Sequence, residues 1–113
     1  MSKFAAWTID EAISIIRMND SNVKHYNYHL ALGGSVLVNG WSDKDLDLYA
    51  LPMHNDEICQ PDRLLKFIQG VLRVVATESK FYKDSNNRAD VLYMLTLPDK
   101  RRIDFFIINR PNQ

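Results

Sequence analysis

The sequence has little cysteine, no excess of charge of either sign and no long apolar run. Its single cysteine, Cys59, cannot form an internal disulfide and has no metal-ligand partner at CxxC spacing, which indicates a reducing compartment. No apolar stretch approaches the roughly 18 residues of a membrane span. The N-terminus also lacks the basic and then apolar run of a signal peptide. These absences predict a cytoplasmic protein that does not enter a membrane.

The charges of the chain cancel, with 14 Lys and Arg against 14 Asp and Glu. A protein that wraps a nucleic acid backbone usually carries an excess of basic residues, so a small nucleic acid binder is disfavoured. With 46% hydrophobic and 25% charged residues, the composition is typical of a globular protein. The length of 113 residues predicts one domain over residues 1–113.

Two segments have the apolar spacing of helices. Thr8 and Glu11 have the spacing of a capping box, and the apolar face that follows predicts a helix over residues 9–18. The polar run at residues 19–22 would end this helix. A second helix with a wide apolar face is predicted over residues 61–76, with a proline in its first turn, where proline is tolerated.

Alternating or continuous β-favouring residues predict several strands. They cover residues 28–32, 45–51, 91–97 and 103–108, with an additional strand near residues 79–83. The turn Pro98-Asp99-Lys100 would join the last two strands in a hairpin, residues 84–88 read as a polar loop, and residues 35–44 are ambiguous between a helical turn and an extended run. The order of elements predicts an α/β (α+β) fold, with helices packed on a mixed β-sheet of about 4–5 strands.

Two acids stand close together in one predicted strand. Asp45 and Asp47 are two residues apart, so both side chains point to the same face. Adjacent carboxylates repel unless a cation neutralises them, and such oxygen ligands suit Mg²⁺. The alternative is the solvated outer face of an edge strand, which the same alternation of acidic and apolar residues would produce.

A glycine-rich turn precedes these acids. Gly33-Gly34-Ser35 follows the apolar strand 28–32, as expected where the backbone approaches an anion closely and donates N–H groups to it. Loops are rich in glycine and serine, so this tripeptide alone is weak support. An apolar strand, the tripeptide and then a strand with two spaced acids is a much less common combination.

A third acid, Asp104, lies within the apolar run Ile103 to Ile108. A buried carboxylate without a partner would cost several kcal/mol. Either a cation or an arginine therefore lies near Asp104, or its strand is an edge from which it faces water. The adjacent pair Phe105-Phe106 indicates that both faces of the strand are largely covered.

Together these residues resemble the DNA polymerase beta nucleotidyltransferase superfamily, in a minimal single-domain form. The matching pattern is an apolar segment, the Gly-Gly-Ser turn, a spacer at residues 36–44, Asp45-Leu46-Asp47-Leu48 and a later acid in an apolar strand. The segment Lys44 to Leu48, which follows the two glycines, also resembles the corresponding motif of tRNA CCA-adding enzymes and poly(A) polymerases. The resemblance covers residues 28–51 and, more loosely, residues 91–108.

This resemblance implies a Mg²⁺-dependent enzyme that transfers a nucleoside monophosphate from an NTP such as ATP to a hydroxyl and releases pyrophosphate. Asp45 and Asp47 would bind two Mg²⁺ ions, while Asp104 would bind the catalytic ion and help to activate the attacking hydroxyl. The implied nucleotide-binding residues are Gly33, Gly34, Ser35 and Lys44. The implied acceptor is a protein, an RNA end or a small molecule, and family members of this size in toxin–antitoxin pairs favour a protein.

An alternative is a non-catalytic binding module on the same fold, acting as an antitoxin-like or inhibitory protein partner. Small family members often carry arginine soon after the glycine turn, where this chain has Val36, Leu37 and Val38. Many relatives also place a helical domain after the third acid, whereas this sequence stops at Gln113. Homo- and hetero-oligomers are both compatible with either hypothesis.

The remaining polar residues give weaker signals. His25, His29 and His54 have no regular metal-ligand spacing and are interpreted as ordinary strand or surface histidines. The basic run Lys100-Arg101-Arg102 could contact a phosphate or an acceptor, or it could be the solvated tip of a hairpin.

Overall fold

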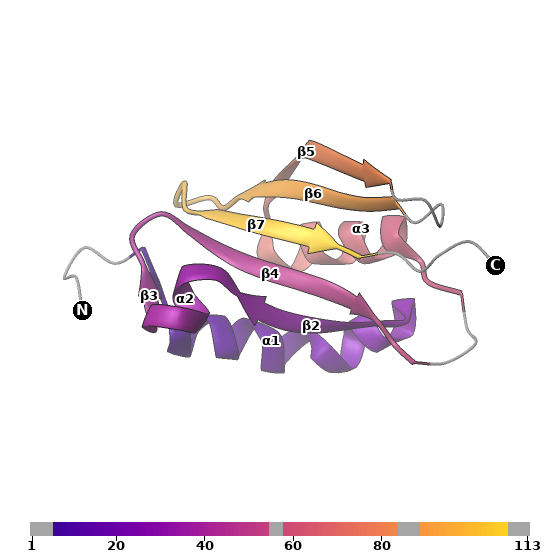
Figure 1. Ribbon diagram of the computed structural model, residues 1–113, viewed down its shortest axis with the longest axis horizontal. Coiled ribbons are helices and arrows are strands. Elements are labelled where there is room, and N and C mark those ends of the chain that lie inside the picture. Colours follow the sequence, from indigo (N-terminus) through magenta and orange to yellow (C-terminus); the bar gives the residue numbers. More distant parts are fainter. Residues whose placement is uncertain (1–5, 55–57, 84–88, 109–113) are drawn as a thin grey trace.

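The computed structural model describes residues 6–54, 58–83 and 89–108, and its central element is a five-stranded mixed sheet with the order β2-β4-β7-β6-β5 (Figure 1). The strands of this sheet are β2 (Tyr28–Gly33), β4 (Asp45–Pro52), β5 (Val75–Lys83), β6 (Ala89–Thr96) and β7 (Arg102–Ile107). A separate two-stranded sheet pairs β1 (Trp7–Thr8) with β3 (Trp41–Ser42). The predicted α/β fold class with a mixed sheet is confirmed.

The first helix, α1 (Ile9–Val23), begins at the predicted capping box. The Thr8 side chain accepts a hydrogen bond from the backbone N–H of Glu11, and the Glu11 side chain bonds back to the Thr8 N–H. The predicted end at residue 18 is wrong, because the polar run remains helical. Asn19 is only 4% exposed and donates to the Ile15 carbonyl oxygen 2.7 Å away, so its polar side chain is satisfied inside the helix. The 3₁₀ helix η1 (Lys24–Tyr26) follows.

The ambiguous segment after the glycine turn forms a short helix, α2 (Gly34–Asn39). It ends at Gly40, whose left-handed φ of 84° suits a residue without a side chain. Val36 faces the core, whereas Leu37 and Val38 are exposed. The chain then enters β3 before the strand that carries the two acids.

The last helix, α3 (Pro61–Leu72), begins where predicted but ends before residue 76. Arg73 adopts a left-handed conformation with a φ of 54° and terminates the helix. Val75, predicted in the last turn, instead begins β5. This β5 is longer than the strand predicted near residues 79–83, and the predicted loop at 84–88 lies outside the described residues.

The position of β7 determines where the site forms. It lies between β4, with which it is parallel, and β6, with which it is antiparallel. β4 is itself interior, because its other neighbour is β2. In Figure 1, α1 and α3 both lie behind the sheet, where Leu46, Leu48, Phe105 and Ile107 pack in the core.

The core is continuous across this face of the sheet and includes the completely buried Leu64 of α3 and Ala12 of α1. Such close packing makes the sheet a rigid base for the polar side chains on its other face. No helix in the described part of the chain is long and apolar enough to cross a membrane.

Candidate functional site

Three carboxylates converge at one end of the paired strands β4 and β7. Asp45 and Asp47 project from β4 and Asp104 from β7, with one carboxylate oxygen of each lying within 4.8 Å of the others. Asp47 and Asp104 are register partners, which fixes their side chains side by side. Three carboxylate oxygens at this separation could hold a metal ion, and their hard character suits Mg²⁺.

The edge-strand explanation for these acids does not apply. β4 and β7 are both interior strands, and the residues next to the acids, Leu46, Leu48 and Ile103, are buried toward the helices. The acids therefore occupy the opposite face of the sheet, in agreement with the two-residue period of a strand. The side chains of Asp45 and Asp104 are 24% and 15% exposed, so the cluster is partly withdrawn from water.

The glycine turn lies directly against this cluster. Gly33 at the end of β2 is the register partner of Asp47, and Gly34 follows with a left-handed φ of 63°. A Cβ atom added to Gly34 would overlap the carboxylate of Asp47, and one added to Gly33 would overlap the Tyr49 ring. The two glycines are thus required by close approach to β4 and, at Gly34, also by backbone conformation.

The sequence indicates that either a cation or an arginine compensates the charge of a buried Asp104. The structure places Arg102 beside this acid. Nη2 of Arg102 lies 2.5 Å from Asp45 Oδ2 and 3.4 Å from Asp104 Oδ2. Its Nε lies 3.1 Å from Asp104 Oδ1. That oxygen is buried and has no partner with hydrogen-bond geometry in the described part of the chain, so the ion pair compensates Asp104 only in part.

Burial and mutual repulsion raise the pKa values of two of the acids. The pKa of Asp104 rises from its ordinary 3.8 to about 6, chiefly because burial disfavours the charged form and next because of a hydrogen bond and repulsion from Asp45, while Arg102 opposes the rise. The pKa of Asp47 is also raised, again mainly by burial and then by the charge of Asp45. A bound cation would favour the ionised forms of both acids.

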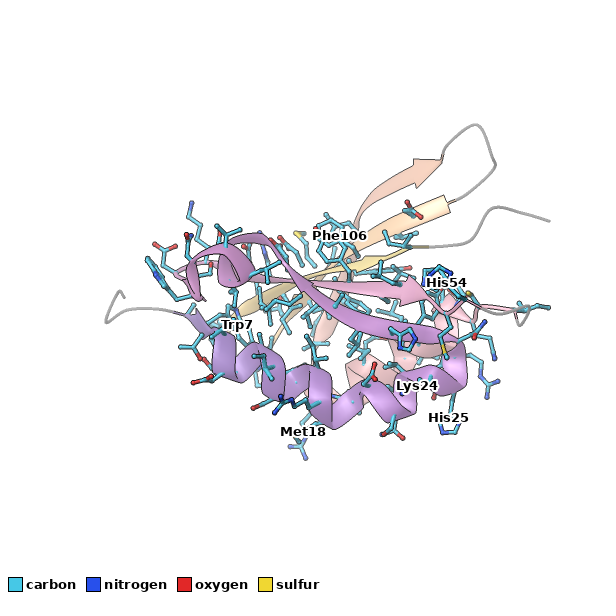
Figure 2. All side chains as sticks on the ribbon, turned by 60° about the horizontal axis from the view of Figure 1, so that its bottom comes forward. Trp7, Met18, Lys24, His25, His54 and Phe106 are labelled. Atoms are coloured by element: carbon cyan, nitrogen blue, oxygen red, sulfur yellow. The ribbon has the colours of Figure 1, made fainter. Side chains whose placement is uncertain are left out.

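Two aromatic rings continue the same face beyond the acids. Tyr49 follows Asp47 by two residues, Phe106 follows Asp104 by two, and the two rings stack with centroids 4.6 Å apart. Figure 2 shows Phe106 on the side of the molecule opposite Met18 and Lys24, which mark the outer surface near α1. Burial and the nearby Asp47 charge raise the pKa of Tyr49.

The other two predicted nucleotide-binding residues flank the site in the sequence, next to Gly34 and Asp45. Ser35 is exposed in the first turn of α2, and Lys44 is exposed in the turn before β4. Within the described residues, neither side chain has a hydrogen bond or ion pair to the three acids; the Lys44 backbone N–H donates to Ser42 Oγ. The structure therefore brings together Asp45, Asp47 and Asp104 with the two glycines.

Arg102 is a site residue that was not predicted from the sequence. In the sequence, Arg102 belongs to the basic run at residues 100–102, which is interpreted either as contacting a phosphate or an acceptor or as a solvated hairpin tip. Arg102 and Asp104 are two residues apart on one strand, so their shared face was a usable signal. Arg101 points elsewhere: it pairs with Glu11 and Asp99 and lies over the Trp7 ring.

The chain matches no protein-family model and no curated protein.

Proposed function

We propose that the protein is a Mg²⁺-dependent nucleotidyltransferase of the DNA polymerase beta-like superfamily, in a minimal form. The observation that carries this proposal is the convergence of Asp45, Asp47 and Asp104 from two interior strands against the glycine turn. Phosphoryl-type transfer depends on charge neutralisation and in-line positioning more than on covalent chemistry by the protein. Three carboxylates on a rigid sheet beside a close-fitting backbone turn are suited to both tasks.

The donor set fits the proposed cofactor. Asp45 and Asp47 would hold two Mg²⁺ ions, with Asp104 as a further ligand of one of them, and the incompletely compensated Asp104 Oδ1 is a natural ligand atom. When bound, Mg²⁺ would neutralise charge on the triphosphate and on the leaving group. Gly33, Gly34 and Ser35 would receive the phosphates, with Lys44 nearby on the turn before β4.

The reaction has a simple balance of bonds. An acceptor hydroxyl oxygen attacks the α-phosphorus of the NTP, the bond from that phosphorus to the bridging oxygen breaks, and pyrophosphate leaves. The hydroxyl proton passes to the Asp104 carboxylate. A bound cation favours the ionised form of this carboxylate, which is the form that can accept the proton.

The acceptor in this proposal is a hydroxyl of a protein, an RNA end or a small molecule, with a protein favoured by the small size of the chain. The balanced charge of 14 basic and 14 acidic residues argues against a long nucleic acid acceptor. The use of an NTP fits a cytoplasmic location. Assembly as a homo- or hetero-oligomer is compatible with the proposal.

Transfer of label from each α-labelled NTP tests the proposal. The protein is incubated with Mg²⁺, each NTP, and a cell extract that supplies acceptors, and labelled protein, RNA and small molecules are separated. We expect transfer by the wild type and none by Asp45→Ala or Asp47→Asn. An exposed acid that lies outside the cluster, Asp62 of α3, provides the matched control Asp62→Asn. Label retained in both active-site variants would refute the assignment.

A non-catalytic binding module is the second candidate, and the surface of α2 favours it. Leu37 and Val38 are 55% and 80% exposed next to the glycine turn, where a catalytic surface would benefit from basic residues. Thermal melting with Mg²⁺ and each NTP separates the two candidates, because a ligand that binds only the native state raises the melting temperature. A shift that depends on Asp45 favours the enzyme; no shift with any nucleotide favours the binding module.

A further inference from the structure

The guanidinium of Arg102 occupies the space between two of the three acids that would bind a cation. It contacts Asp45 through Nη2 at 2.5 Å and Asp104 through Nε at 3.1 Å. Among the described residues, no ion pair reaches the third acid, Asp47. The three carboxylates and one guanidinium leave a formal excess of two negative charges, which still attracts a divalent cation.

We infer that Arg102 is a displaceable internal counter-ion, which a divalent cation must remove from Asp45 and Asp104 in order to bind. Arg102 thereby lowers the affinity of the empty site and keeps it neutralised between binding events. This inference rests on the proposed function, because it concerns the occupancy of the same site. It adds a role for a residue that neither donates an oxygen ligand nor belongs to the glycine turn.

The surroundings of Arg102 allow its side chain to leave without disturbing the strand. The side chain is 46% exposed, so the released guanidinium would be hydrated at once. The backbone is fixed, because Arg102 pairs with Asp45 on one side and Thr96 on the other. Its carbonyl oxygen also accepts a hydrogen bond of 3.0 Å from Trp7 Nε1. Displacement is therefore a rotation of one side chain on a fixed β-strand.

Asp47 provides a starting point for the exchange. Its carboxylate is adjacent to Asp104 across the strands and lies against Gly34, and it makes no ion pair in the described part of the chain, although the charge of Arg102 acts on it. A cation can contact Asp47 first and then take the oxygens of Asp45 and Asp104 as the guanidinium departs. The double charge of a divalent ion attracts the carboxylates more strongly at equal distance than the single charge of the guanidinium does, and the two partly exposed ion pairs of Arg102 are individually weak.

Calorimetric titration of the full chain with Mg²⁺ and with Mn²⁺, at pH 7.5 and low ionic strength, tests this inference. Arg102→Gln removes the counter-ion, and we expect it to bind each cation about tenfold more tightly than the wild type, as expected when two partly exposed ion pairs no longer compete. Arg102→Lys keeps the charge but cannot bridge two carboxylates, so an intermediate affinity is expected. Lys100→Asn removes the same charge from the same hairpin, at a left-handed position that Asn tolerates, and should leave affinity unchanged.

The outcomes separate this inference from the proposed function. Tighter binding by Arg102→Gln, with Lys100→Asn unchanged, supports the counter-ion role, as does cation binding that appears only in Arg102→Gln. Equal or weaker binding by a folded Arg102→Gln, when the wild type binds, overturns the counter-ion role and leaves the cation site standing. Absence of binding in every variant overturns both. Circular dichroism establishes that each variant is folded, and if the glutamine variant is not, the affinity of Arg102→Lys relative to the wild type decides in its place.

Discussion

Replacement of Asp104 by asparagine should stabilise the protein in the absence of metal. Asp104→Asn keeps the shape of the side chain and mimics the protonated acid, but removes the charge that the site disfavours. The native pKa of about 6 lies above the ordinary value of 3.8, so the native state holds the Asp104 proton more tightly than the unfolded chain does. The stabilisation from this group is complete below the ordinary pKa of 3.8, and it is lost as pH rises through the native pKa of about 6.

The size of the effect follows from the two pKa values. Their separation corresponds to at most about 3 kcal/mol at pH 7. Because the side chain is still 15% exposed and borders water on the open face, solvent screening reduces the expected gain to about 1–2 kcal/mol. The gain should be smaller at pH 5, where the native acid is already mostly protonated, and absent below about pH 4.

Urea unfolding with EDTA present measures this prediction at pH 5 and pH 7. Asp43→Asn is the control, because Asp43 is an exposed acid just before β4 and lies outside the carboxylate cluster. We expect Asp43→Asn to change the free energy of unfolding by less than about 0.5 kcal/mol. A loss of stability in Asp104→Asn at pH 7, with the fold retained, would show that the Asp104–Arg102 ion pair outweighs burial and repulsion, and would refute the reasoning.

Three further predictions concern the same elements. Gly34→Ala should lower the free energy of unfolding, measured with urea, by more than about 2 kcal/mol and abolish cation-linked stabilisation, because its Cβ overlaps Asp47 at a φ of 63°. Gly40→Ala has a φ of 84° but open space around it, so it should lower the same free energy by about 1 kcal/mol. The rise in melting temperature caused by Mg²⁺ should shrink as pH falls from 7 to 5, since protons compete for Asp104, whose pKa is raised to about 6; a rise independent of pH would place the cation elsewhere. Thr8→Ala, which removes the capping box of α1, should lower the free energy of unfolding by about 1 kcal/mol, and Thr8→Ser should recover most of it.

The face on which the acids lie could be predicted from the sequence. A strand has a side-chain period of two residues, so Asp45 and Asp47 had to share a face, and the buried Leu46 between them had to point to the other. The capping box likewise fixed the start of α1 from local chemistry alone. Local patterns of this kind depend on neighbours within a few residues, which are visible in the sequence.

The parallel pairing of β4 with β7 could not be predicted in the same way. It joins segments that lie far apart in the sequence, and the choice of partner depends on the whole sheet rather than on either strand. The contact of Arg102 with Asp45, across 57 residues, follows only from that pairing. The ends of α1 and α3 were also mispredicted. The Asn19 side chain is buried and donates to the Ile15 carbonyl oxygen within the helix, so the polar run does not end α1, and the left-handed Arg73 ends α3 early.

From the insertion of β7 between β4 and β6, we expect a particular order of folding events. The β6–β7 hairpin is a local structure, as is the β2–α2–β4 unit, and each can form early, whereas their union closes a long segment of chain and is slow. Before that union one unit carries two of the acids and the other carries one, so neither presents all three carboxylates to a cation. The complete cluster arises at the moment the two halves dock, and the kinetics of cation uptake in a stopped-flow refolding experiment would follow that docking step directly.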